Sequence, residues 1–272
     1  MARSFVKLPS FSNVSKGNTA TLELPLGRTY DKIYVNYTGV TLAQLKNIRI
    51  EVNGKAILEF KDGQALANYN KRYGRNTAAN VLDFHFKRDE LVTLAEKRMF
   101  GLGTASVQGH PTIANVTLRV EIDAAATSPK LEAHAIQSNP SPIGYITKVK
   151  NFPVALNAGV TEIDKLPRPA SARIAAIHVI TDATVEKLEV EIDSIKVFDM
   201  PKTLAEKIQV DHDRAPQSGQ VSADFILEGD LKQAIPLQGL QDFRLRVETA
   251  SNTPAATAAT VVVEYFDGLA GI

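Results

Sequence analysis

The sequence predicts an all-β protein made of two copies of one domain, with a few short helices between the strands. Three observations lead to this prediction. Apolar and polar residues alternate along short segments, turn residues interrupt these segments about every ten positions, and the second half of the chain repeats the first. The segments with the alternating pattern, which we expect to be strands, are 19–24, 32–37, 48–52, 81–86, 116–122, 175–180, 188–192, 243–248 and 261–266.

The repeat is clearest between IRIEVNGKAILEF, residues 48–60, and LEVEIDSIKVFDM, residues 188–200. Apolar positions coincide along both segments, and Asn53-Gly54 aligns with Asp193-Ser194. A two-residue Asn-Gly connection between alternating segments is typical of a tight β-hairpin. Both segments are therefore predicted to form hairpins.

Further matches between the halves keep the same order along the chain. They are Gly17 and Thr19 with Gly159 and Thr161, Val35 with Val179, Leu66-Ala67 with Leu204-Ala205, Asp83-Phe84 with Asp224-Phe225, Gln108-Gly109 with Gln238-Gly239, and Leu118–Glu121 with Leu245–Glu248. The offset falls by about 11 residues between the Asp-Phe and the Gln-Gly matches. We therefore expect an insertion in the first half, coinciding with a helix at 88–101.

The repeat sets the predicted domain boundaries. One copy occupies 1–137 and the other 143–272, and QSNPSP at 137–142 has two prolines that suit an extended linker. Each copy offers seven or eight strands, and eight strands in two facing sheets make a jelly roll. The predicted fold is thus two tandem eight-stranded jelly-roll β-sandwiches, a double jelly roll.

Three short helices interrupt the strands. The segments are GQALANYNKRY (63–73), RDELVTLAEKRMFG (88–101) and KTLAEKIQ (202–209). In the second of them, we expect Asp89 to be the N-cap and Gly101 to end the helix. Its apolar residues are expected to face the core: Leu91, Leu94, Ala95 and Met99.

Composition limits the functions that this chain can have. The 31 Lys and Arg nearly balance the 30 Asp and Glu, so no global charge attracts nucleic acid or an anionic membrane. The chain has no cysteine, which excludes disulfides and thiolate metal sites. The N-terminus lacks the apolar core of a secretory signal, and no apolar run approaches the roughly 18 residues of a membrane span, so we expect a soluble protein.

The sequence shows no catalytic signature and no cofactor-binding motif. It lacks the closely spaced histidine pair of a cupin metal site, a nucleophile elbow and a P-loop, and GLGTASVQG (101–109) has the glycines of a dinucleotide-binding loop without its preceding strand. His85, His134 and His178 lie singly within strands, where we expect hydrogen-bonded or surface histidines.

Two clusters and the N-terminal segment remain as candidate sites. Asp211 and Asp213 flank His212 and are candidate oxygen ligands for Ca²⁺, although a solvated acidic loop explains them as well. YNKRYGRN (69–76) interleaves tyrosines with basic residues, which suits either phosphate and base contacts or a helix end with inward-packed tyrosines. The N-terminal segment is either an arm that docks on a neighbour or lipid headgroup, or a first strand.

The tandem repeat without catalytic residues resembles a known family. KLPSFSNVSKGNTATLELPLG (7–27) is echoed by KVKNFPVALNAGVTEIDKLPR (148–168). Two jelly rolls in a chain of this size resemble the double jelly-roll major capsid proteins of icosahedral viruses with an internal membrane. The compact halves are most similar to the coat protein of corticoviruses, which are membrane-containing phages.

This resemblance implies a structural protein with no reaction to catalyse. It implies a homotrimer whose six jelly rolls form a pseudo-hexagonal tile of the virion capsid, near an internal membrane and without direct contact to nucleic acid. Implied partners are other copies of the chain, a vertex (penton) protein and minor membrane proteins. No cofactor is required, Ca²⁺ is implied as a capsid-stabilising ion, and assembly is expected in the host cytoplasm.

A second class of function stays open at this point. A glycan-binding or glycan-cleaving protein can also be built on two jelly rolls, with a pocket near Asp211 and Asp213. The absence of Trp weighs against this alternative, because sugar-binding sites often use aromatic platforms.

Overall fold

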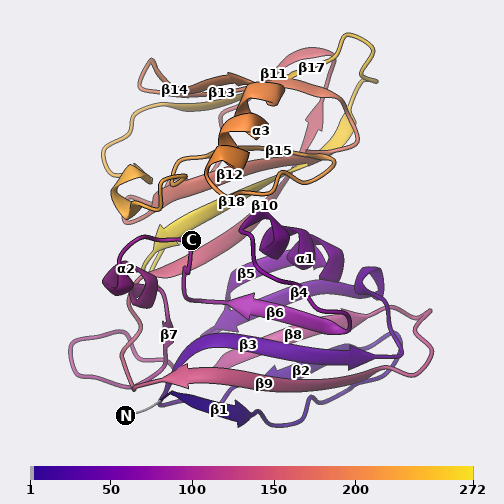
Figure 1. Cartoon of the computed structure of the whole chain (residues 1–272), viewed down its shortest axis with the longest axis vertical. Helices are drawn as coiled ribbons and strands as arrows, with labels where there is room; N and C mark the ends of the chain where they lie inside the picture. The colour runs from indigo at the N-terminus through magenta and orange to yellow at the C-terminus, as the bar shows by residue number, and fades with distance from the viewer. Residues whose placement is uncertain (1–2, 272) are drawn as a thin grey trace. The chain divides into compact units, whose positions relative to one another are not determined.

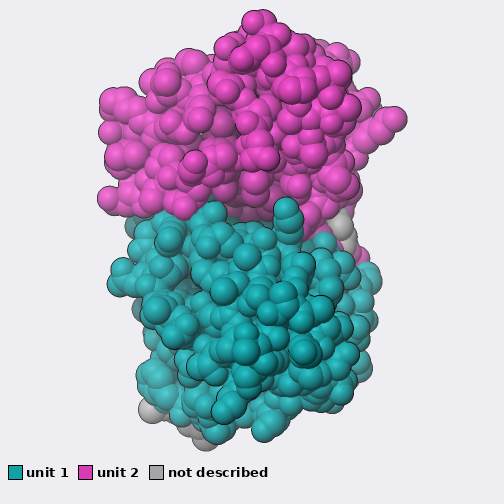
Figure 2. Space-filling model, turned by 90° about the vertical axis from the view of Figure 1, so that its right-hand side faces the viewer, with its two compact units in different colours: residues 1–149 teal, residues 150–272 magenta. Residues whose placement is uncertain are grey.

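The computed structural model describes residues 3–271 and divides the chain into two compact units. Unit 1 runs up to Val149, and unit 2 begins at Lys150 (Figures 1 and 2). The domain boundaries predicted from the repeat, 1–137 and 143–272, stay a prediction. Figure 1 shows that each unit contains two layers of strands.

Unit 1 contains two runs of hydrogen-bonded strands. One has the order β1-β9-β3-β6, with the short β7 beside β3, and the other has the order β2-β8-β4-β5. The bounds are β1 Ser4–Lys7, β2 Thr19–Glu23, β3 Thr29–Thr38, β4 Leu45–Val52, β5 Lys55–Asp62, β6 Val81–His85, β7 Leu102–Gly103, β8 Val116–Ile122 and β9 Lys130–Ser138.

Unit 2 repeats this arrangement strand for strand. One run has the order β10-β18-β12-β15, with the short β16 beside β12, and the other has the order β11-β17-β13-β14. The bounds are β10 Ile146–Leu156, β11 Gly159–Ile163, β12 Arg173–Thr181, β13 Val185–Ile192, β14 Ile195–Pro201, β15 Gln220–Asp224, β16 Ile235–Pro236, β17 Phe243–Thr249 and β18 Thr257–Asp267. The identical strand order confirms the predicted tandem jelly rolls.

Alternation of apolar and polar residues produces the core of each unit. Along β8, every second side chain from Val116 to Ile122 is buried, while Arg119 between them is exposed. The counterpart strand β17 has the same pattern from Phe243 to Thr249. Because successive strand side chains point to opposite faces, one face of each strand enters the core and the other faces outward. All nine predicted strands are confirmed, while β7, β9, β10, β11, β15 and β16 were not predicted.

The two predicted hairpin turns have the same backbone. Asn53 and Gly54 have φ of 51° and 77°, and Asp193 and Ser194 have φ of 46° and 68°. Two successive residues with positive φ are typical of the type I′ turn, whose twist matches paired strands. The side chain of Asn53 also accepts from the amides of Ala114 and Asn115. Asp193 accepts in the same way from the amides of Gln241 and Asp242.

Helices α1 (Gly63–Arg72) and α3 (Lys202–Asp211) are counterparts that follow β5 and β14. Asp62 caps α1 by accepting from the amide of Ala65, whereas α3 begins after Pro201, whose fixed φ suits a helix start. Both helices were predicted, and both end in the same way. The amides of Arg75 and Arg214 return to the carbonyls of Asn70 and Gln209.

The prediction of a helix at 88–101 is wrong in two respects, the bounds of the helix and the side chains that it buries. Only α2 (Leu94–Met99) is helical, and Thr93 is its N-cap in a reciprocal capping box with Glu96. Asp89 instead pairs with Lys32 at 2.7 Å. Leu91 is buried as expected, but Leu94 is 57% exposed, Met99 is 44% exposed and Ala95 is also exposed. The capping box places the N-cap four residues later than predicted, at Thr93 instead of Asp89, and the side chains of this shorter helix face outward.

The predicted insertion is divided between two connections. Sixteen residues, 86–101, connect β6 to β7, whereas ten, 225–234, connect β15 to β16. Twelve residues, 104–115, then connect β7 to β8, against six, 237–242, in unit 2. Only half of the extra length therefore lies with α2, whose counterpart in unit 2 is the single 3-10 turn Leu231–Gln233. No helix within residues 3–271 has the length and apolar character of a membrane span.

Candidate functional surfaces

The two candidate calcium ligands lie at the end of α3, where each has a local structural role. Asp211 is the last residue of α3 and pairs with Lys207 one turn earlier, and both side chains are exposed. Asp213 follows the helix with φ of 57°, at the left-handed position that Gly74 holds after α1. No group of three metal-ligating side chains exists among residues 3–271. A calcium site at Asp211 and Asp213 stays a prediction.

The basic and tyrosine-rich segment at the end of α1 is packed into unit 1. Arg72 and Tyr73 are buried, and the guanidinium of Arg75 lies over the rings of Tyr69 and Tyr73 at 5.5 and 5.0 Å. Arg75 also pairs with Glu90 from the insertion, at 3.4 Å. Arg75 is already occupied by a carboxylate and two aromatic rings, which favours the structural alternative, a helix end with inward-packed tyrosines.

His85 departs from the expectation for single strand histidines. Neither of its ring nitrogens has a hydrogen-bond partner among the described residues. Burial, and next to it the charge of Arg75, lowers the pKa of His85 to about 2, so its ring is neutral. His85 is thus a half-buried neutral ring whose nitrogens are buried, rather than a hydrogen-bonded or surface histidine.

A serine, a histidine and a glutamate meet inside unit 2. His178 Nδ1 lies 2.8 Å from Ser222 Oγ, and His178 Nε2 lies 2.8 Å from Glu264 Oε1. The order of groups is that of a nucleophile, a base and an acid. All three residues are buried, however, so a substrate has no access to the serine. We interpret this group as a satisfied buried network, for which the scattered positions of Ser222 and Glu264 give no sequence signal.

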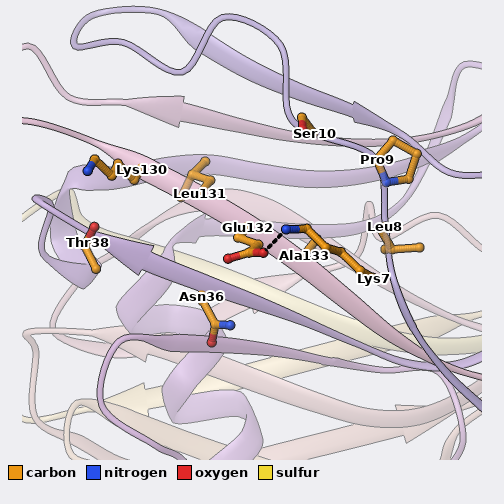
Figure 3. Close-up of a pocket in the computed structure, with 10 residues that line it drawn as sticks. All are labelled: Lys7, Leu8, Pro9, Ser10, Asn36, Thr38, Lys130, Leu131, Glu132 and Ala133. Carbon is orange, nitrogen blue, oxygen red and sulfur yellow. Dashed lines mark ion pairs between the residues drawn. The ribbon is translucent and has the colours of Figure 1, made fainter.

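The N-terminal segment is a first strand, and it forms one wall of a shallow groove (Figure 3). β1 pairs antiparallel with β9, so the segment is a strand, as one of the two alternatives predicted. The groove has a volume of about 360 Å³, and the ion pair between Lys7 and Glu132 lies across it. None of its ten lining residues is aromatic, and Glu132 is the single carboxylate among them. The groove offers neither a stacking platform nor paired carboxylates for a sugar.

Charged residues cover the outer face of β11, β17 and β13. Arg246 pairs with Glu162 and Glu191, both at 2.7 Å, and with Glu189. These three hydrogen bonds, which Arg246 donates first to Glu191 and then to Glu162 and Glu189, raise the pKa of Arg246 above its usual value. Hydrogen bonding by Lys196, the largest favourable contribution, together with Arg246 lowers the pKa of Glu189. The counterpart in unit 1 is simpler, because Arg119 pairs with Glu51 at 3.2 Å.

Family models cover both units. One model, described as the N-terminal domain of viral coat protein P2, matches residues 5–139, and a second, described as its C-terminal domain, matches residues 146–269. Major capsid protein P2 of Pseudoalteromonas phage PM2 is 37% identical over 270 residues, which are 97% of this chain and 96% of that protein.

Solved structures agree in fold. The crystal structure of major capsid protein P2 from bacteriophage PM2 matches with a TM-score of 0.92 at 37% identity, covering 100% of both chains. The STIV major capsid protein matches with a TM-score of 0.70 at 12% identity, covering 97% of both chains. The Faustovirus major capsid protein matches with a TM-score of 0.63 at 8% identity, covering 98% of this chain and 89% of that one. At such low identities the last two show the double jelly-roll fold alone.

Proposed function

We propose that this chain, which belongs to the family of viral coat protein P2 and is a structural capsid protein, assembles into homotrimeric pseudo-hexagonal capsomers. These capsomers tile an icosahedral shell around an internal lipid membrane. The further partners would be a vertex protein and minor membrane proteins of the virion, with assembly in the host cytoplasm. Family membership favours this function over the glycan-binding alternative.

The observation that carries the trimer proposal is the internal repeat. Both units have the same strand order, so each chain supplies two related jelly rolls. Three such chains around a threefold axis present six similar edges, which suits a tile with six neighbours. The near balance of 31 basic and 30 acidic residues also fits a coat that a lipid bilayer separates from the nucleic acid.

Calcium belongs to this proposal as a structural ion. Among the described residues no single group of ligands can hold it, so we place the ion at contacts between chains, where each chain supplies part of the ligand set. Exposed acidic side chains such as Asp211 and Asp213 are the candidates. Ca²⁺ would then strengthen the association of chains rather than the folding of one chain.

Solution mass tests the proposal. The purified full-length chain is measured by size-exclusion chromatography with light scattering, once with Ca²⁺ and once with a chelator. We expect about three chain masses with Ca²⁺ and a smaller or heterogeneous species with the chelator. A trimer that is insensitive to the chelator would remove calcium from the proposal. A monomer in both buffers would overturn the capsomer.

A further inference from the structure

β5 in unit 1 and β14 in unit 2 are counterparts down to the register. Leu58 lies opposite Ile50, and Phe198 lies opposite Val190. Both hairpins also have an irregularity at the same place, directly after Ile50 and directly after Val190. Each strand begins immediately after its two-residue turn, at Lys55 and at Ile195. A contact made by β5 therefore has a defined equivalent position on β14.

The outer edge of β5 is covered by another strand. Val149, the last residue of unit 1, lies on the first part of β10 and pairs in parallel with Leu58. The two paired residues are almost fully buried: Val149 is 0% and Leu58 is 5% exposed, and the neighbouring Ile57 is 1% exposed. The backbone groups of β5 that point away from β4 thus have a neighbour, as buried strand edges require.

The outer edge of β14 has no such neighbour. Within residues 3–271, β14 pairs only with β13. Val197, which corresponds to the buried Ile57, is 43% exposed, and Ile195 at the start of the strand is 67% exposed. A seven-residue edge strand with exposed apolar side chains is a template for pairing with another chain.

The repeat also identifies the segment that corresponds to the covering strand. KLPSF at 7–11 is echoed by KVKNF at 148–152, so Lys7 corresponds to Lys148 and Leu8 to Val149. Three residues earlier, Phe5 on β1 corresponds to Ile146. β1 pairs only with β9 among the described residues. Phe5 is 76% exposed, although its counterpart is buried.

Transferring the pairing of Val149 and Leu58 onto these counterparts sets a register. Leu8 lies opposite Phe198, and three residues back on each strand Phe5 lies opposite Ile195. Two highly exposed apolar side chains, Phe5 and Ile195, therefore meet at the start of the new pair, and the better buried Leu8 and Phe198 meet three residues further along.

We propose that the outer edge of β14 binds β1 of a second copy of the chain in parallel. β1 and β14 of one chain are not paired with each other within residues 3–271, and we assign the covering strand to a second copy. Main-chain hydrogen bonds provide the attraction, and the contact of Phe5 with Ile195 fixes the register. The contact joins two different surfaces, so its repetition gives a ring when the rotation between chains closes, as the proposed threefold capsomer requires. This inference rests on the proposed capsomer and names the surfaces that hold it together.

Engineered cysteines test this contact, because the chain has none of its own. The double variant Phe5→Cys/Ile195→Cys is purified and oxidised, and its mass is read on a denaturing gel without reductant. The matched control is Phe5→Cys/Val160→Cys, since Val160 is 60% exposed on β11 at the opposite edge of the same sheet. We expect about tenfold more covalent oligomer from the first variant, because a disulfide needs Cα atoms about 4.4–6.8 Å apart.

A mixing experiment identifies the source of each strand. Phe5→Cys and Ile195→Cys single variants are oxidised separately and then as an equal mixture that was first dissociated and reassembled. Covalent dimers should form mainly in the mixture, because each bond needs one residue of each kind. Equal cross-linking in the separate samples would overturn the pairing of β1 with β14.

Light scattering on the same samples separates the two proposals. A trimer by mass without cross-links in the Phe5→Cys/Ile195→Cys variant would overturn the strand pairing and leave the capsomer intact. A monomer by mass in the wild-type chain would overturn both. A trimer with cross-links specific to this variant supports both.

Discussion

The two units have an arginine at an equivalent position, and each unit pairs it with a carboxylate from a different part of the fold. Arg75 follows α1 and Arg214 follows α3, and the amide of each returns to the equivalent helical carbonyl. In unit 2, Arg214 pairs with Asp224 of its own sheet at 3.2 Å. In unit 1, the corresponding arginine pairs with Glu90 at 3.4 Å. The repeat has kept the cation and changed the source of its carboxylate.

The insertion in unit 1 explains this change. It supplies Glu90 to Arg75 and also brings Arg88, which pairs with the same carboxylate and donates to the hydroxyl of Tyr69 at 3.0 Å. Asp83, the counterpart of Asp224, is left in a site where burial raises its pKa. An inserted segment can thus enter a repeated fold by taking over an existing ion pair, which anchors it without a new core.

Removing the carboxylate from either pair should have the largest effect. We expect Glu90→Gln and Asp224→Asn each to lower the free energy of unfolding by about 3–5 kcal/mol, because each leaves a buried guanidinium without its anion. Hydrogen exchange read by mass spectrometry should locate the loss in unit 1 for the first variant and in unit 2 for the second. Asp211→Asn, at an exposed pair, is the control. If either variant lost protection in both units, the two units would not unfold independently, and the prediction would be wrong.

His85 makes unit 1 the more acid-sensitive unit. Its counterpart in unit 2 is Ile226, which cannot titrate and is buried. The pKa of His85 is about 2 in the folded chain, against about 6.5 when unfolded. Between these values the unfolded chain binds more protons, so stability falls as the pH drops below about 6.5.

Replacing His85 should remove part of this sensitivity. Between pH 7 and pH 5 the linkage amounts to about 2 kcal/mol of lost stability, and His85→Ile should recover it. Urea unfolding curves of the wild type and the variant at both pH values measure the difference. His134→Gln, at a half-buried position, is the matched control. If the wild type and His85→Ile lost the same stability between pH 7 and pH 5, His85 would not be the source of the acid sensitivity.

The sequence predicted the architecture because both signals can be read from the sequence alone. The alternating pattern depends on neighbouring residues, and the repeat appears when the two halves are aligned. Period-two segments set the strands, and turns such as Asn53-Gly54 set the hairpins. The partners of buried charges were not predictable, because Arg75 and Glu90 meet only through the placement of the insertion. The outward face of α2 was also missed, since the capping box of Thr93 and Glu96 overrode the earlier candidate cap at Asp89. Similarly, the exposed edge of β14 became visible only from its comparison with β5.

The ion pairs on the outer sheet faces should also contribute differently to the free energy of unfolding in the two units. This difference should be smaller than the effects described above. Arg246 contacts three carboxylates on its sheet, whereas Arg119 contacts one. Exposed ion pairs contribute about 0–1 kcal/mol to the free energy of unfolding, and networks of several charges contribute at the upper end of that range. We expect Arg246→Met to cost about 1 kcal/mol at low salt and Arg119→Met about half as much. Because salt screens exposed charges, both costs should shrink at 1 M NaCl, where the Debye length is about 3 Å. Costs that do not change with salt would indicate lost packing instead.

The smallest expected effect is at the turn of the second hairpin. Gly54 adopts its positive φ freely, but Ser194 at the equivalent position has a Cβ that disfavours φ of 68°. Ser194→Gly should therefore raise the free energy of unfolding by about 0.5 kcal/mol, the relief of strain being partly offset by the larger freedom of glycine in the unfolded chain. Gly54→Ser should lower it by a similar amount in unit 1. Opposite signs from these reciprocal changes, measured by urea unfolding, would show that the two turns are equivalent, whereas equal signs would show that their surroundings decide.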